Sequence, residues 1–192
     1  MKSIYLICLI SITFSTSLFG QKLLAEVGNE RNIYIIHYGQ IPTFEYDSVT
    51  TLFKKGGLDK GWKCSRMIDK MLKKMSKDEI KGDAIIFTSE NMNDALVINF
   101  REKELAKPTV ELEKIGDVYL MYLEQRPLFE MEFVMAIESP KVIKNWRTST
   151  LRKIMLKKAL SSNRKFNVLH FKEDDLWQAD SYITGVDQPK EN

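Results

Sequence analysis

Three residues in this chain could supply a nucleophile and its base: Cys64, His37 and His170. A reactive thiolate is favoured at a helix N-terminus and beside a base. Cys64 falls in the first turns of an expected helix, and each histidine falls late in an expected strand. These residues predict one candidate function, a thiol-dependent hydrolase or transferase that uses Cys64 with His37 or His170.

The helix that carries Cys64 also favours a purely structural role for this residue. One side of the helix is apolar at the helical period, and the residues on it are Cys64, Met67, Ile68, Met71, Leu72 and Met75. Cysteine outside disulfides is among the most often buried residue types. We therefore expect Cys64 in the core and no catalytic residue in the chain, with the thiol enzyme as the alternative.

The stretch W-K-C-S-R-M-I-D around Cys64 resembles the active-site helix of thioredoxin-like proteins. Those proteins use a pair of cysteines for their redox chemistry. The second cysteine is missing here, so the resemblance does not extend to the activity.

Metal and carboxylate chemistry is weakly supported by the residue spacing. Cys64 and the two histidines match no zinc-binding pattern, so no metal site is expected. Glu130 and Glu132 are neighbours on one strand face, whereas a glycosidase pair must face each other across a substrate. No cofactor-binding motif occurs, and we expect no cofactor.

Lysine and arginine dominate the outward faces of two expected helical segments, and no acidic residue lies between Ser139 and Lys172. Clustered basic side chains attract anionic partners. The residues that could form such a surface are Lys63, Arg66, Lys70, Lys73, Lys74, Arg152, Lys153, Lys157 and Lys158. The alternative is a solvated surface that balances the acidic middle of the chain.

The first residues predict export. Met1-Lys2 precedes an apolar run from Ile4 to Phe14, and small residues follow as far as Gly20. This order is typical of a secretory signal peptide cleaved after about residue 20, which would place the protein outside the cell or in the periplasm. An uncleaved membrane anchor is the alternative, although a spanning helix needs about 20 apolar residues. Cleavage removes Cys8 and leaves Cys64 without an internal disulfide partner.

The elements that would position these residues are read from periodicity. We expect strands at 32–38, 84–88, 95–101, 117–123, 128–137 and 166–171, a short helix ending at 55, a main helix at 60–76, and a helical region at 139–160 broken at 148–150. In the strand at 128–137, Phe133 and Ile137 fall on one inward face. Trp177 and Tyr182 are expected to hold an irregular tail. No internal repeat is evident.

This order predicts an α+β fold: a single antiparallel sheet, a meander of about five to six strands, covered on one face by two main helices. The order is similar to that of helix-grip folds, where a curved sheet wraps a long C-terminal helix around an apolar cavity. We expect a signal peptide at 1–20, a single domain at 21–185 and a flexible tail at 186–192.

The favoured function is an exported, non-catalytic binding or interaction module. Its partner would be an apolar small molecule between sheet and helices, an anionic ligand or lipid surface on the basic helices, or an envelope protein. Nucleic acid is the least favoured partner of an exported protein. Methionine-rich faces such as that of Met67 and Met71 suit an adaptable apolar interface.

Overall fold

A computed structural model describes residues 22–55, 63–102, 107–138, 148–172, 176 and 178–185. The expected signal peptide and the expected tail from 186 lie outside the described residues. So does the first part, 139–147, of the second helical region.

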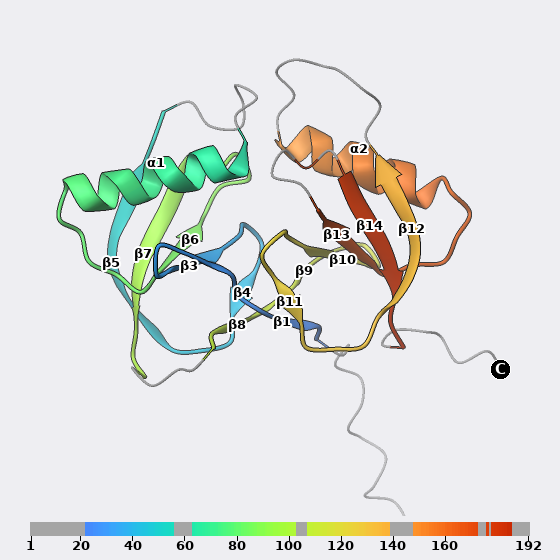
Figure 1. Ribbon diagram of the computed structural model, residues 1–192, viewed down its shortest axis with the longest axis horizontal. Coiled ribbons are helices and arrows are strands. Elements are labelled where there is room, and N and C mark those ends of the chain that lie inside the picture. The colour runs from blue at the N-terminus through green and yellow to red at the C-terminus, as the bar shows by residue number, and fades with distance from the viewer. Residues whose placement is uncertain are drawn as a thin grey trace, which may run out of the picture.

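The described part of the chain contains one series of eight elements that occurs twice (Figure 1). The first series is β1 (Leu24–Glu26), β2 (Asn29–Glu30), β3 (Ile33–Ile36), β4 (Ile41–Pro42), β5 (Tyr46–Phe53), α1 (Cys64–Lys77), β6 (Ala84–Phe87) and β7 (Asp94–Phe100). The second is β8 (Thr109–Glu111), β9 (Glu113–Ile115), β10 (Val118–Met121), β11 (Arg126–Pro127), β12 (Glu132–Glu138), α2 (Thr148–Leu160), β13 (Val168–Phe171) and β14 (Gln178–Ile183).

Each series forms its own five-stranded sheet, in the orders β2-β3-β6-β7-β5 and β9-β10-β13-β14-β12. The third sheet, β11-β1-β8-β4, is shared, because each half contributes two strands that alternate across it. At its centre β1 and β8 pair antiparallel, with Ala25 opposite Val110. The two halves are therefore related by an approximate two-fold axis through the shared sheet.

The two-fold relation extends to individual side chains. Equivalent residues in this region lie 85 positions apart, as Gln40 and Gln125 do. Lys22 pairs with Glu111 at 2.7 Å, and the equivalent ion pair joins Lys107 to Glu26 at 3.1 Å. Both pairs cross from one half to the other.

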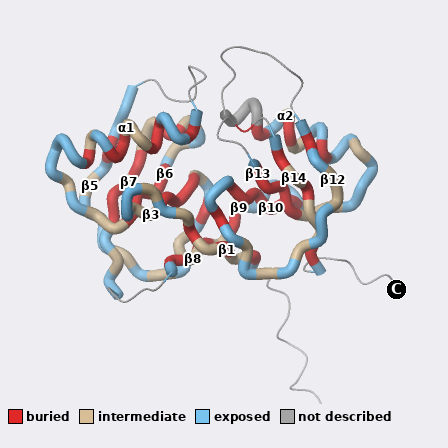
Figure 2. The backbone as a smooth tube through the Cα atoms, in the orientation of Figure 1, coloured by how far each residue is buried: buried red, intermediate tan, exposed pale blue. Residues whose placement is uncertain are grey.

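One buried cluster lies beneath both helices, and two smaller clusters separate the five-stranded sheets from the shared sheet. The centre of each five-stranded sheet is thus buried on both faces, which explains the continuous apolar runs of β6 and β10 (Figure 2). The α1 stripe from Cys64 to Met75 is buried as the helical period predicted.

The expectation of a single sheet covered by two helices is wrong. The described residues are mostly β, with fourteen strands in three sheets and two helices. Most strand pairs are antiparallel, but β3–β6 and β10–β13 are parallel. The expected meander fails because the chain crosses through α1 or α2 between parallel strands, so β13 and β14 separate β10 from β12.

Two expected elements also have the wrong type. The short helix expected to end at 55 is strand β5, which pairs with β7 along its length. Its Val49, Thr50 and Thr51 are β-branched residues that favour strands. The tail expected to be irregular around Tyr182 is strand β14, paired with both β12 and β13.

Phe133 and Ile137 do not share one inward face of β12 as expected, because a β-bulge lies between them. The pairing with β14 shifts between Phe133 and Met135, and the equivalent shift in β5 lies between Ser48 and Thr50. A bulge reverses the side-chain alternation on one side of it. Phe133 is therefore 56% exposed, while Ile137 is buried as expected.

No helix among the described residues is both long and apolar enough to cross a bilayer.

Candidate ligand pocket between the two halves

Two equivalent glutamines lie buried where the halves meet. Each Nε2 of Gln40 and Gln125 donates to the Oε1 of the other at 2.8 Å. The same Oε1 atoms accept the backbone N–H groups of His37 and Tyr122, at 3.1 and 2.9 Å. This reciprocal pair fixes the two loops that follow β3 and β10 against each other.

Beside the glutamines, aromatic rings from both halves are stacked. The His37 ring lies on the Tyr122 ring with centroids 4.3 Å apart, and Tyr122 lies 5.6 Å from Phe171. Burial, with the nearby charge of Arg152, lowers the pKa of His37 to about 4. Burial also raises the pKa of Tyr122. Both rings are therefore neutral at pH 7.

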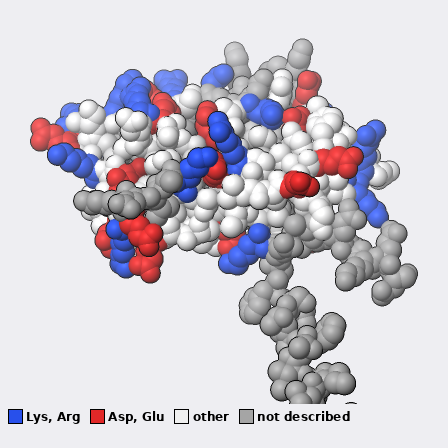
Figure 3. Space-filling view, turned by 60° about the horizontal axis from the view of Figure 1, so that its bottom comes forward, with Lys and Arg blue, Asp and Glu red and all other residues white. Residues whose placement is uncertain are grey.

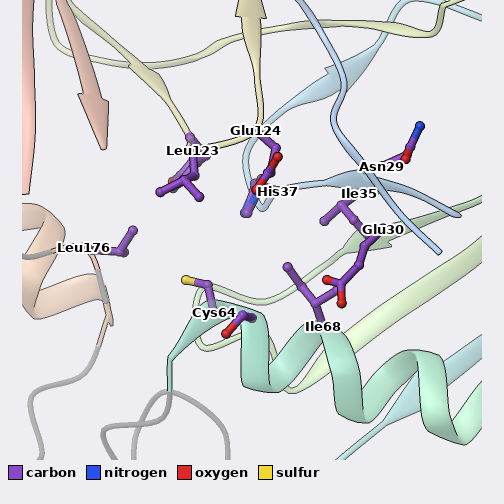
Figure 4. Close-up of a pocket in the computed structure, with 11 residues that line it drawn as sticks. Asn29, Glu30, Ile35, His37, Cys64, Ile68, Leu123, Glu124 and Leu176 are labelled. Atoms are coloured by element: carbon purple, nitrogen blue, oxygen red, sulfur yellow. The ribbon is translucent and has the colours of Figure 1, made fainter. Parts of the chain in front are cut away.

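A pocket of about 270 Å³ opens on the α1 side of this stack. Residues of both halves line it: Asn29, Glu30, Ile35, His37, Cys64, Ser65, Ile68, Tyr122, Leu123, Glu124 and Leu176. Figure 4 shows Cys64 and Ile68 on α1, with Leu176 and Leu123 of the second half across the pocket from Glu30. The walls are mainly apolar. The two carboxylates among them are Glu30, in the edge strand β2, and Glu124, in the loop after β10.

Cys64 is the first residue of α1 and is 8% exposed, so its predicted burial is confirmed. Its sulfur points toward the pocket, which His37 also lines (Figure 4). The structure thus brings together two of the three residues of the thiol-enzyme hypothesis. An imidazole with a pKa of about 4 is a poor base for a thiol, whose ordinary pKa is about 8.5.

His170 lies apart from these two residues. Its strand neighbours Leu169 and Phe171 join the cluster that holds Cys64, and strand alternation turns His170 to the other face. Burial and Lys172 lower its pKa to about 4. The nearby backbone of Tyr122 and Leu123 and the charge of Asp180 oppose this lowering only in part.

On the α2 side of the stack, an ion pair lies where the two-fold relation places a second pocket. Arg152 is 4% exposed and donates from Nη2 to Glu113 Oε2. Burial alone would lower the pKa of Arg152, but Tyr122 and Glu113 raise it. Gly39, at φ 84°, makes room for Glu113, since a Cβ would lie 2.4 Å from its Cδ. Arg152 therefore does not belong to the exposed basic surface predicted from the sequence.

The other predicted basic residues remain on or near the surface. Lys63, Arg66, Lys73, Lys153, Lys157 and Lys158 are exposed, and Lys70 and Lys74 are half-buried. Lys73 pairs with Asp69 at 2.7 Å, and Lys74 donates to the Phe53 carbonyl. Figure 3 looks from below the view of Figure 1, and on that face basic and acidic side chains are interspersed. Binding of an anionic partner by the helices stays a prediction.

The sequence carries a signal for this site that the periodicity reading missed. Gln40-Ile41-Pro42-Thr43-Phe44-Glu45 and Gln125-Arg126-Pro127-Leu128-Phe129-Glu130 share Gln, Pro, Phe and Glu at the same spacing. A comparison of the chain with itself would have found both halves and their glutamines. The expectation of no internal repeat was wrong.

Within the described residues, no group of three or more histidine, cysteine or acidic side chains converges as metal ligands would. No protein-family profile matches the chain, and comparisons with curated proteins and with solved structures return no match.

The two buried histidines predict an acid-sensitive fold. Their pKa values lie near 4 in the folded protein, against 6.5 ordinarily, so the unfolded chain binds more protons between these values. The free energy of unfolding should be independent of histidine above pH 6.5 and should fall as pH drops toward 4. Urea titrations across this range should show a smaller fall in His170→Gln and His37→Gln than in the parent. Parallel curves for parent and both variants would contradict the prediction.

Proposed function

We propose that the protein is an exported, non-catalytic binding module that takes a small ligand, or one large side chain of a partner, between its halves. The observation that carries this proposal is the pocket beside Ile68 and the His37–Tyr122 stack. Its volume of about 270 Å³ lies just below the range of about 300–1,000 Å³ usual for ligand sites. The N-terminal sequence supports export.

The position of the pocket also supports binding. Ligand sites often form where two structural units meet, with apolar walls and a few polar groups that orient the ligand. Here the walls come from α1, β3 and the loops after β10 and before β14. The glutamine pair holds the loop after β10 against the loop after β3 without a ligand, so binding needs little ordering of this wall.

Titration with neutral probes, such as pentylurea and benzyl alcohol, tests the proposal. We expect saturable chemical-shift changes at pocket residues in NMR spectra, and Ile68→Phe should weaken binding because the larger ring fills the space. Leu160→Phe, at an exposed position of α2, is the matched control and should bind as the parent does. The absence of binding for all neutral and charged probes would overturn the proposal.

A second candidate, a thiol-dependent hydrolase or transferase, is favoured by one observation. Cys64 and His37 line the same pocket. The low pKa of His37 counts against it, because a neutral imidazole of weak basicity does not hold a thiolate. Thiol labelling by a maleimide separates the two candidates. Labelling only after denaturant is added fits the buried Cys64 of a binding module, whereas rapid labelling of the native protein at neutral pH would favour the enzyme.

A further inference from the structure

The pocket on the α1 side of the stack and the Arg152–Glu113 ion pair on its α2 side occupy equivalent places but differ in content. Ile68 of α1 and Arg152 of α2 are equivalent, since Met71 and Met155, each three residues further on, are both fully buried. In the second half the Arg152 guanidinium reaches Glu113 beside Tyr122. In the first half the shorter Ile68 side chain does not reach the equivalent position, and the pocket lies there.

The two-fold relation also holds for the glutamates, but a glutamate in one half takes the place of a glycine in the other: Glu113 is equivalent to Gly28, and Glu124 to Gly39. Glu113 faces Gly39, and in the other half Glu124 faces Gly28, where an added Cβ would lie 2.2 Å from the Glu124 Cβ. Each site therefore has a glutamate opposite a glycine. Glu113 has its cation within the chain, whereas Glu124 forms no ion pair with any described residue.

A second carboxylate, Glu30, lies at the same pocket as Glu124 (Figure 4). It too forms no ion pair within the described part of the chain. The positive charges nearby are the partial charge at the N-terminus of α1 and the charge of Arg152, which acts on His37 and is paired with Glu113. His37 is neutral. The two carboxylates therefore decide the preference of the pocket, and they are the groups to test.

The geometry points to a ligand with a guanidinium or ammonium group on a short apolar stem, which would occupy in the first half the place that Arg152 fills in the second. The stem would lie on Ile35 and Ile68, and the cation would face Glu30 and Glu124. This inference rests on the proposed function and adds the charge of its ligand. Such a group could belong to a small amine or to an arginine or lysine of a partner protein.

Pentylguanidine and its neutral isostere pentylurea provide a matched pair of probes. We expect the guanidine to bind about three- to tenfold more tightly, as two partly exposed carboxylate contacts would give. Glu124→Gln and Glu30→Gln should each lower this ratio, and the double variant should bring it near one. Glu130→Gln, an exposed carboxylate elsewhere, is the control.

Equal binding of the two probes to the parent protein would overturn the inference while leaving the proposed function intact. An unchanged ratio in the double variant would overturn it as well. Failure of both probes would remove the proposed function itself. A blocked Gly-Arg-Gly peptide separates the sources: tight binding supports a partner side chain, and its absence alongside pentylguanidine binding supports a small amine.

The Ile68→Arg variant tests the equivalence of the halves directly. The new guanidinium should fill the pocket and abolish binding of both probes. Because a buried arginine can prevent folding, the Glu124 and Glu30 variants, which change exposed and half-exposed side chains, decide the inference independently.

Discussion

Replacing Arg152 by methionine is expected to destabilise the protein by about 3–5 kcal/mol, because it leaves the Glu113 carboxylate buried without its partner. The side chains of Arg152 and Glu113 are 4% and 14% exposed, so water cannot replace the lost contact fully. Glu113→Gln should cost a similar amount by stranding the guanidinium. The free energy of unfolding in urea measures both effects.

The double variant Arg152→Met/Glu113→Gln should recover most of the loss, since replacing both members of a buried ion pair is often nearly neutral. The equivalent Ile68 shows that this frame accepts an apolar side chain. Lys153→Met, at the exposed neighbouring position, controls for helix propensity and net charge. Additive losses in the double variant would show that the two residues do not act as a pair.

Replacing Gln125 by alanine is expected to be the second large effect. It orphans the buried amide of Gln40 and the backbone N–H of Tyr122, at about 1–3 kcal/mol for each unsatisfied group. By the two-fold relation Gln40→Ala should cost about as much, because it strands Gln125 and the N–H of His37. Urea unfolding gives both values.

The control for the glutamine pair is Gln178→Ala, at the exposed start of β14. It should change stability little, since its side chain can be hydrated in either state. The double variant of Gln40 and Gln125 should lose less than the sum of the single variants, as each single change already breaks the shared bonds. A negligible loss in both single variants would show that the pair does not fix the loops.

The sequence predicted those elements whose burial can be recognised from the pattern of their own residues. The α1 stripe, the buried runs of β6, β10 and β13 and the apolar residues of β7 are local patterns, and these elements were predicted near their observed bounds. The second helix was harder to read because Arg152 lies at a core-facing position, where its charge breaks the apolar stripe. Its partner Glu113 is distant in sequence.

Strand pairing was beyond the reach of local patterns. The order of the expected strands predicted a meander, whereas β3 pairs with β6 and β10 with β13 after long crossovers. For the same reason the burial of Cys64 could be predicted but its pocket could not, because His37, Tyr122 and Leu176 reach it from distant segments. The shared Q-x-P-x-F-E pattern was the available clue to that arrangement.

The approximate two-fold relation within one chain allows a freedom that a pair of identical chains lacks. In a symmetric homodimer every substitution appears twice, so an arginine introduced into one site would close the other too. Here Ile68 and Arg152, or Gly39 and Glu124, vary independently although they hold matching places. The site with Arg152 can stabilise the fold while the equivalent site beside Ile68 stays accessible to molecules from the solvent.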